Sequence, residues 1–451
     1  MKNIKYQIPI QFEYENSCLI NTETLLETGK KLIPEIERVK HAWTTQGYES
    51  VYAALNLVQD RQILKDIKKI AQEKKALKPT MLIVIGIGGS SLGLKAIHQA
   101  LYGSFYNEQN PEITLYIADT IDTDHVRNIF LLAEQELETG NKIILNIISK
   151  SGTTLETIIN AQLFISLIRC AHPKTYQQYV VITTEPESPL WSFANSHSFT
   201  KLPIQPQVGG RYSVFSAAGL FPLALLDVAI DKLIDGAYNT SLACLKSNIL
   251  ENPAALRALI LAEQYKRDIH IHDMFIFSTD LSEIGAWYRQ LMGESLGKTD
   301  TTKDKKKVGI TPTTSVGTTD LHSVGQLYLG GPYVQYTTFV SVEENKNNFV
   351  ILNKKAKELK LATLEKKWVH TITLGILQGV KQAYTLNKRP FTAITIPEKS
   401  EYCIGMLMQL HMFEIIYTGF LLNVNPFDQP DVELYKKEAY KIVDNLSKEK
   451  L

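Results

Sequence analysis

The stretch Met81-Leu-Ile-Val-Ile-Gly-Ile-Gly-Gly-Ser-Ser-Leu-Gly93 decides the fold. Its first five residues form an apolar run rich in β-branched side chains, which is typical of a strand buried on both faces. The glycines from Gly86 onward end that strand and let the backbone turn sharply into a helix. A strand joined to a helix by a glycine-rich turn begins a βαβ unit, so the stretch predicts a parallel sheet.

Similar apolar runs recur along the chain, separated by helical stretches. The first series continues at 113–118, 142–148 and 179–183. A second series follows residue 267, with strands expected at 273–277, 333–342 and 391–396 and helices at 281–290 and 368–384. We therefore predict an α/β fold with two lobes, each a mainly parallel sheet flanked by helices.

Helical extensions are expected at both ends of the chain. The first 75 residues mix apolar and charged side chains and predict helices at 23–39 and 51–77, whereas the apolar stretch 211–230 predicts one buried helix between the lobes. A loop at 425–430 precedes a helix from Asp431 onward. The predicted segments are an N-terminal helical part (1–75), a first lobe (76–205), connecting helices (206–265), a second lobe (266–422) and a C-terminal loop and helix (423–451).

The composition excludes several classes of protein. The 451 residues carry a net charge of +1, so no overall field attracts nucleic acid or an anionic membrane. The apolar stretch 403–422 contains Gln409, His411 and Glu414, which indicates a buried helix and no membrane span. The N-terminus has no secretory signal pattern, and the four cysteines are far apart, which predicts buried reduced thiols and no zinc site. We expect a cytoplasmic protein without a metal.

Two loops that follow predicted strands have features of anion sites. The first, Gly86–Gly93, opens a helix, whose N-terminus favours negative charge. A dinucleotide fingerprint would need a glycine where this chain has Ser91, and a Walker loop would need a lysine where it has Leu94. The bland alternative is a plain tight turn. The second, Ser149-Lys-Ser-Gly-Thr-Thr154, has four hydroxyls within six residues. Ser149, Ser151 and Thr154 are the expected phosphate ligands, because hydroxyl and backbone N–H donors can surround one phosphate.

Three further residues, Arg211, Glu294 and His322, carry candidate chemistry, and each has a bland alternative. Thr153 is expected to cap the helix after the phosphate loop, with Glu156 as its capping-box partner. Arg211, at the expected mouth of the buried helix, has a rigid fork for an oxyanion or for a structural ion pair. Glu294 follows a glycine in an expected loop, where it can serve as a base or be an ordinary surface residue. His322 can transfer protons near neutral pH or have a structural role.

The motifs together resemble the phosphoglucose isomerase family. The segments that carry the resemblance are GIGGSSLG (86–93), SKSGTTLET (149–157), GGRYSVFS (209–216), GESLGK (293–298), TDLHSVGQ (319–326) and NPFDQPDVELYKK (425–437). Each motif alone is weak, but the set keeps the family's order over about 350 residues. The resemblance implies two sugar-isomerase-type lobes, a homodimer with shared active sites, and interconversion of glucose 6-phosphate and fructose 6-phosphate without metal or organic cofactor.

The resemblance also implies a role for each site residue. Ser149, Ser151 and Thr154 would hold the phosphate with Lys150, while Gly89, Ser90 and Gln290 would line the sugar site. Glu294 would move the proton between C2 and C1, and Arg211 would stabilise the enediolate. His322, from the partner subunit, would assist ring opening together with Lys436.

Two positions depart from the family pattern, and two other functions compete. Leu296 stands where a polar residue is usual, and Asp431 replaces a glycine, which makes Lys437 an alternative to Lys436. A sugar-phosphate sensor would keep the phosphate loop without needing Glu294, Arg211 or His322. An isomerase or epimerase acting on another hexose phosphate, such as mannose 6-phosphate, would differ only in pocket shape.

Overall fold

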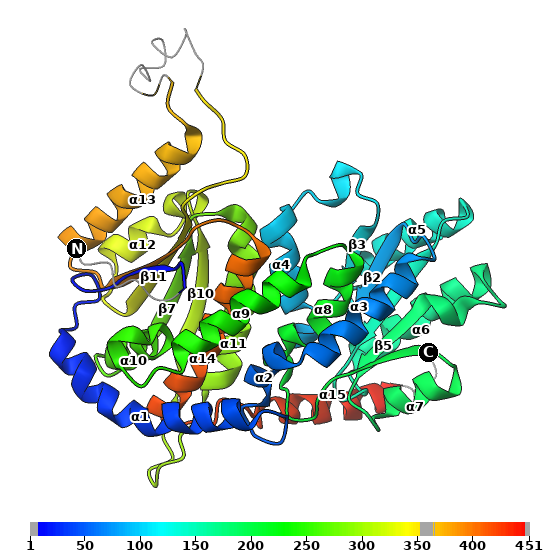
Figure 1. The fold of residues 1–451 in the computed structure, drawn as a ribbon, viewed down its shortest axis with the longest axis horizontal. Coiled ribbons are helices and arrows are strands. Elements are labelled where there is room, and N and C mark those ends of the chain that lie inside the picture. The colour runs from blue at the N-terminus through cyan, green and yellow to red at the C-terminus, as the bar shows by residue number, and fades with distance from the viewer. Residues whose placement is uncertain (1–7, 352–363, 365, 447–451) are drawn as a thin grey trace.

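The computed structural model describes residues 8–351, 364 and 366–446, and it has two lobes, each built on a five-stranded sheet (Figure 1). The lobe on the right of Figure 1 holds the first sheet, in the order β3-β2-β4-β5-β6. Its strands are all parallel and comprise β2 (Met81–Ile85), β3 (Thr114–Ala118), β4 (Ile143–Ile148), β5 (Val180–Thr184) and β6 (Thr200–Pro203).

The second sheet has the order β1-β12-β11-β7-β10. Its four parallel strands are β7 (Ile271–Ile276), β10 (Thr311–Val316), β11 (Gln335–Val342) and β12 (Phe391–Ile396). The antiparallel edge strand β1 (Gln11–Glu13) comes from the N-terminus, which the sequence predicted to be helical. A separate ribbon pairs β8 (Lys298–Thr299) with β9 (Lys307–Val308).

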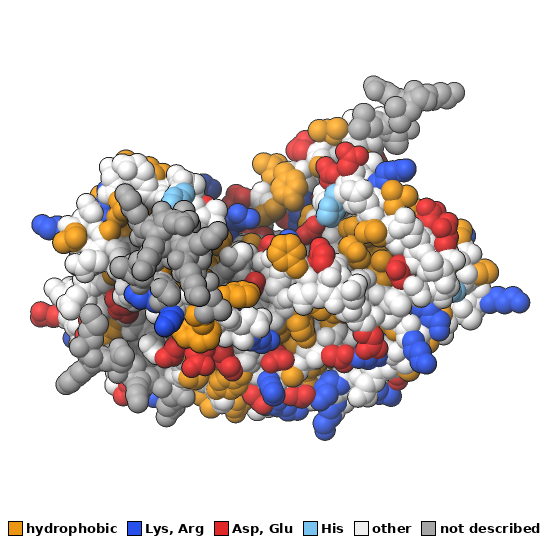
Figure 2. All heavy atoms as spheres, turned by 90° about the horizontal axis from the view of Figure 1, so that it is seen from above, with side chains coloured by type: hydrophobic (Ala, Val, Ile, Leu, Met, Phe, Trp, Pro, Cys, Tyr) orange, Lys and Arg blue, Asp and Glu red, His pale blue; other side chains and the backbone are white. Residues whose placement is uncertain are grey.

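Helices cover both sheets and fill the space between them. The first half of the chain contributes α1 (Thr22–Thr45), α2 (Ala53–Asn56), α3 (Arg61–Lys75), α4 (Leu92–Tyr102), α5 (Thr123–Glu138), α6 (Leu155–Ala171), α7 (Pro189–Ser196) and α8 (Ala217–Leu225). The second half contributes α9 (Ile230–Cys244), α10 (Pro253–Tyr265), α11 (Ser282–Leu296), α12 (Gly325–Gly330), α13 (Val369–Leu386), α14 (Glu401–Leu421) and α15 (Val432–Leu446). The space-filling view shows the surface hollowed between the two lobes (Figure 2).

Helix α14 has the length and apolarity of a membrane span, but 89% of its apolar window is buried inside the protein. It packs against α9, α10 and α11, as the central position of α14 in Figure 1 illustrates. Its Glu414 carboxylate receives two hydrogen bonds of 2.9 Å from the buried Arg257 and one of 3.1 Å from Tyr288. The charges near Glu414, Arg257 foremost, outweigh burial and hold the pKa of its carboxyl at about 2. The buried-helix prediction for 403–422 is therefore confirmed.

The structure corrects several local predictions. The segment 211–230 is not one helix, because a 3₁₀ turn at Gly210–Phe215 precedes α8, whose N-cap is Ser216. The segment 51–77 is likewise broken, since Asp60 caps α3. The sequence missed the edge strands β1 and β6 and the strand β10. One cysteine, Cys170, is exposed, contrary to the prediction of four buried thiols.

Candidate active site

The phosphate loop, residues 149–154, lies between β4 and α6 as predicted. The Ser149 and Thr154 hydroxyl oxygens are 3.0 Å apart, and the backbone N–H of Gly152 donates to Ser149 Oγ at 3.2 Å. Gly152 has a φ of +69°, and a Cβ there would lie 2.8 Å from the backbone nitrogen of Leu190. The loop therefore needs glycine to close around the start of α6, where helix N–H groups favour an anion.

The predicted cap of α6 was wrong. Thr154, and not Thr153, is the N-cap residue, and its side chain makes no capping hydrogen bond. The Thr154 hydroxyl instead pairs with Ser149, while the Thr153 hydroxyl donates to Ser151 Oγ at 3.0 Å. The hydroxyls bond within the loop, which leaves the first N–H groups of α6 without side-chain acceptors and suited to a ligand anion.

Lys150 extends from the phosphate loop toward the segment that leads to Arg211. Its ammonium donates to the carbonyl oxygen of Pro206. Burial lowers the pKa of Lys150 below its ordinary value, and Glu185 opposes that shift. In this arrangement Lys150 ties the phosphate loop to the neighbouring chain.

The glycine-rich loop after β2 packs directly against the turn that carries Arg211. A Cβ placed on Gly89 would lie 2.2 Å from the carbonyl carbon of Gly210 and 2.6 Å from the backbone nitrogen of Arg211. At Gly86 a Cβ would lie 2.9 Å from Ser90 Cβ and 3.0 Å from the Ile148 carbonyl oxygen, next to the phosphate loop. The backbone contacts therefore hold three of the predicted motifs together.

Arg211 is buried and uses all of its donor groups. Its Nε donates to Ser295 Oγ at 2.7 Å, and its Nη2 donates to the carbonyl oxygens of Pro426 at 2.6 Å and Asp428 at 2.9 Å. Its Nη1 donates to Gln429 Oε1 at 2.9 Å and to Glu294 Oε2 at 3.2 Å. An arginine has five N–H donors, so the guanidinium is held in one orientation by two separate segments of the chain, the end of α11 and the 425–430 loop.

Glu294 lies in the last turn of α11, and the prediction that it sits in a loop was wrong. Gly293 does not end the helix, because one glycine costs an α-helix only about 1 kcal/mol. Glu294 is 32% exposed, and Gln290, one turn earlier on α11, donates to its Oε1 at 2.8 Å. Among the described residues, the buried Oε1 of Gln290 has no hydrogen-bond partner, so it is open to a ligand hydroxyl.

Apart from Glu294, the residues that hold Arg211 were not predicted from the sequence. Ser295 accepts from Arg211 and also lies 3.0 Å from the Tyr212 hydroxyl. Lys298 donates to the Asn425 carbonyl oxygen at 2.5 Å and to Asp428 Oδ1 at 2.6 Å, so two cations fasten the 425–430 loop. Burial, the larger effect, lowers the pKa of Lys298. Spacing gives no signal for these contacts, because several of them use backbone carbonyls.

Lys436 lies on α15, which runs beneath the first lobe in Figure 1. Its ammonium pairs with Glu433 at 2.7 Å. One turn further along, the Tyr440 hydroxyl donates to the Thr153 carbonyl oxygen at 2.6 Å. Because residues four apart share a helix face, Lys436 lies on the side of α15 that faces the phosphate loop.

His322 lies in the other lobe, in the 3₁₀ turn Thr319–His322 after β10. It is exposed, and in the described part of the chain it makes no hydrogen bond with any other predicted site residue. The structure therefore brings together Gly89, Ser90, Gln290, Glu294, Arg211 and the phosphate loop, with Lys436 on the helix beside it, but not His322.

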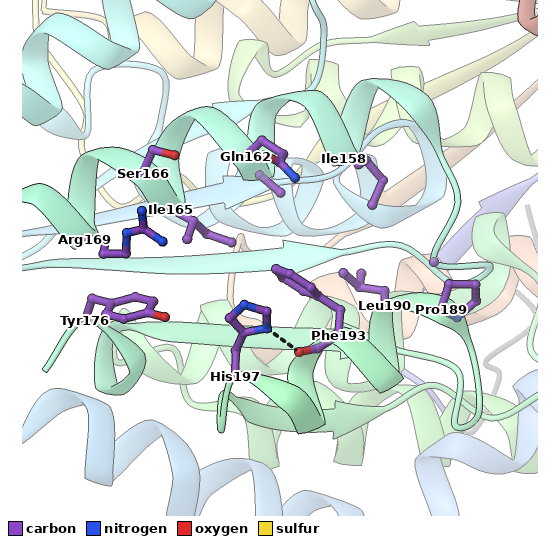
Figure 3. Close-up of a pocket in the computed structure, with 12 residues that line it drawn as sticks. Ile158, Gln162, Ile165, Ser166, Arg169, Tyr176, Pro189, Leu190, Phe193 and His197 are labelled. Carbon is purple, nitrogen blue, oxygen red and sulfur yellow. Dashed lines mark hydrogen bonds between the residues drawn. The ribbon is translucent and has the colours of Figure 1, made fainter. Parts of the chain in front are cut away.

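An apolar groove of about 410 Å³ lies beside the phosphate loop, between α6 and α7. Figure 3 shows Ile158 and Ile165 of α6 facing Leu190 and Phe193 of α7, with His197 hydrogen-bonded to the Phe193 carbonyl oxygen at 3.0 Å. Gly152 of the phosphate loop borders this groove, but none of the predicted site side chains lines it. Its apolar walls do not suit a charged sugar phosphate, so the candidate site remains the cluster around Arg211.

Comparisons with known proteins identify the family of the chain. The sequence profile of the family described as "Phosphoglucose isomerase" matches residues 40–451. A glucose-6-phosphate isomerase from Carboxydothermus hydrogenoformans is 32% identical over 84% of this chain and 82% of its own. Another from Fusobacterium nucleatum is 33% identical over 87% of this chain and 86% of its own.

Two solved structures have the same fold. A hypothetical protein from Thermus thermophilus has a TM-score of 0.83 at 28% identity, covering 93% of this chain and 96% of its own. A glucose-6-phosphate isomerase from Chlamydia trachomatis has a TM-score of 0.80 at 21% identity, covering 97% and 89%. The two-lobed α/β architecture is thus confirmed, and the chain belongs to the phosphoglucose isomerase family.

Proposed function

We propose that this chain interconverts glucose 6-phosphate and fructose 6-phosphate through an enediolate, at the site formed by Glu294, Arg211, Gln290 and the phosphate loop. The observation that carries the proposal is the contact of Glu294 with both Arg211 and Gln290, beside Gly89. Aldose–ketose isomerisation needs a base for the proton between C1 and C2 and a cation for the developing oxyanion. This cluster supplies both in adjacent positions.

The hydrogen bonds of Arg211 support a way for the substrate to engage the site. All five donors are occupied, but the bond from Nη1 to Glu294 is the longest, at 3.2 Å, and its acceptor is partly exposed. A substrate oxygen would take over this donor and a sugar hydroxyl would donate to the free Gln290 Oε1. Release of the Glu294 carboxylate from Arg211 then frees it to act as the base, while the other four bonds keep Arg211 in place.

The phosphate would bind at the N-terminus of α6, held by Ser149, Ser151 and Thr154, with Lys150 contributing from the same loop. Lys436, or its neighbour Lys437, would act near the ring oxygen with His322 of the partner subunit. The exposure of His322 and its distance in the fold from Glu294 support a shared site in a homodimer. A cytoplasmic location belongs to the proposal and agrees with four free cysteines.

A coupled assay tests the reaction. Fructose 6-phosphate is supplied, and the glucose 6-phosphate formed is oxidised by an NADP-dependent dehydrogenase, with absorbance at 340 nm as the readout. Mannose 6-phosphate is run in parallel. The proposal is supported if the wild-type chain turns over fructose 6-phosphate and Glu294→Gln lowers that turnover at least a hundredfold. An inactive wild-type chain, or full activity in Glu294→Gln, would refute it.

Subunit mixing tests the shared site. Glu294→Gln and His322→Ala are each expected to be nearly inactive alone. After they are unfolded and refolded together, a mixed dimer has one site with intact Glu294 and an intact His322 from its partner, so activity returns. No recovery, despite mixed dimers detected by native mass spectrometry, would place His322 in the same subunit as its site.

A further inference from the structure

Another cavity, lined mainly by polar residues, lies between the strand ends of the second sheet and the C-terminal end of α4. It has a volume of about 490 Å³ and is lined at the ends of three neighbouring strands, by Thr279 after β7, Thr318 after β10 and Asn345 and Lys346 after β11. Ligands of open α/β sheets bind at the carboxyl ends of the strands, where the strand order reverses. The cavity occupies that position in the second sheet.

The two sheets have matching topology, which makes this cavity the counterpart of the sugar-phosphate site. In the first sheet the parallel strands run β3-β2-β4-β5, and in the second they run β10-β7-β11-β12. Each order reads second, first, third, fourth along the chain of its lobe. The segment after β11, residues 343–347, therefore corresponds to the phosphate loop after β4, and the segment after β7 corresponds to the glycine-rich loop after β2.

The charge of the lining favours an anion. Its only described carboxylate, Asp280, is paired with Lys399. Lys346 has no carboxylate within ion-pair distance among the described residues, and its ammonium contacts only the Leu101 carbonyl oxygen at 3.4 Å. The N-terminal end of α13, at His370, also borders the cavity, as does the 3₁₀ turn Thr279–Leu281 that leads into α11. Helix N-termini add positive potential.

The hydrogen bonds around His370 indicate a ligand that also donates. His370 Nε2 donates to the Glu343 carbonyl oxygen at 2.9 Å, and Asn345 Nδ2 lies 2.8 Å from His370 Nδ1. Among the described residues, this leaves the buried Asn345 Oδ1 without a partner. A hydroxyl group of a ligand would satisfy that acceptor.

We propose that this cavity binds a small phosphorylated polyol, with its phosphate at Lys346 and the hydroxyls of Thr279 and Thr318 and one hydroxyl donating to Asn345 Oδ1. Within one subunit, the site is separate from the cluster around Glu294 and Arg211. Helices α4 and α11 connect the two sites. The C-terminal residue of α4, Tyr102, borders the cavity, and its N-terminal end adjoins the glycine-rich loop. Asp280, just before α11, borders the cavity, and Glu294 lies near the other end of α11.

Equilibrium dialysis with radiolabelled glycerol 3-phosphate tests the site. The protein is the full chain with Ser151→Ala and Thr154→Ala, which weakens binding at the catalytic site. We expect about one ligand per subunit, at least tenfold weaker binding after Lys346→Glu, and unchanged binding after Lys69→Glu, an exposed lysine on α3 that makes the same charge change. Inorganic phosphate should displace the label, and glycerol should not.

Three results would overturn the assignment: no binding to the starting protein, equal loss in both lysine variants, or displacement by glycerol but not by phosphate. The outcome is independent of the proposed reaction. Lys346→Glu in the otherwise unchanged chain is expected to keep isomerase turnover in the absence of glycerol 3-phosphate, whereas a wild-type chain without turnover would refute the isomerase alone.

Discussion

Replacing Gly89 by alanine should damage the active site by moving the backbone that carries Arg211. The added Cβ would lie 2.2 Å from the Gly210 carbonyl carbon, 2.3 Å from its oxygen and 2.6 Å from the Arg211 nitrogen. Carbon atoms pack at about 3.5–4.0 Å, so the two loops must separate by roughly 1 Å. All three neighbours are backbone atoms, so no side-chain rotation can relieve the clash. A displacement of that size can cost about a hundredfold in rate.

Gly210→Ala is the matched control, because it places the same methyl group in the same pair of loops. A Cβ on Gly210 would have Gly89 Cα, 3.9 Å away, as its nearest neighbour, which is ordinary contact. We expect Gly89→Ala to lose about a hundredfold in kcat/KM and about 1–3 kcal/mol in the free energy of unfolding. Gly210→Ala should keep kcat/KM within about threefold.

The coupled isomerase assay and unfolding in guanidinium chloride measure both quantities. Wild-type kcat/KM in Gly89→Ala would refute the inference that the contact of these loops positions Arg211. Equal defects in the two variants would refute it as well, because the steric difference between the positions would then have no effect.

Four further predictions follow from the same structure. Glu294→Gln should lower kcat by about 10² to 10⁴ with little change in KM, since a base acts in the transition state; a raised KM with unchanged kcat would contradict that role. Ser295→Ala should lower kcat by roughly tenfold because Arg211 Nε loses its acceptor, whereas Ser295→Thr keeps a hydroxyl and should retain part of that activity. Equal kcat in the two variants would contradict the role of Ser295 in positioning Arg211. Glu414→Gln should cost about 3–5 kcal/mol of unfolding free energy, because it leaves a buried arginine without its carboxylate, whereas Glu251→Gln at an exposed pair should leave the unfolding midpoint unchanged. Burial lowers the pKa of His98 from 6.5 to about 4, so the unfolded chain binds its proton first and stability falls as the pH drops below 6.5, by about 2 kcal/mol at pH 5; His98→Phe should show a smaller loss, and an identical pH profile would refute the assignment.

The parts of the fold that the sequence predicted best are the strands with an unambiguous apolar signal. The strands 81–85 and 391–396 lie where they were expected, because each is a short, buried run with few alternatives. The strand Thr311–Val316 was missed, since its threonines and proline resemble a loop and most of its residues are only partly buried. Its place in the sheet comes from pairing with β7, a contact between segments distant in sequence.

The residues of the candidate site also differ in how far the sequence reveals them. Residues that carry chemistry are easier to recognise than the residues that hold them in place. A base, a cation and a ring of hydroxyls have recognisable side chains, so Glu294, Arg211 and the loop 149–154 could be named as candidates from the sequence. The groups that orient Arg211 could not, because two of its five acceptors are carbonyl oxygens of the 425–430 loop and a carbonyl has no sequence signal. Any change that shifts this loop should therefore lower turnover through Arg211, even where the altered residue touches no substrate.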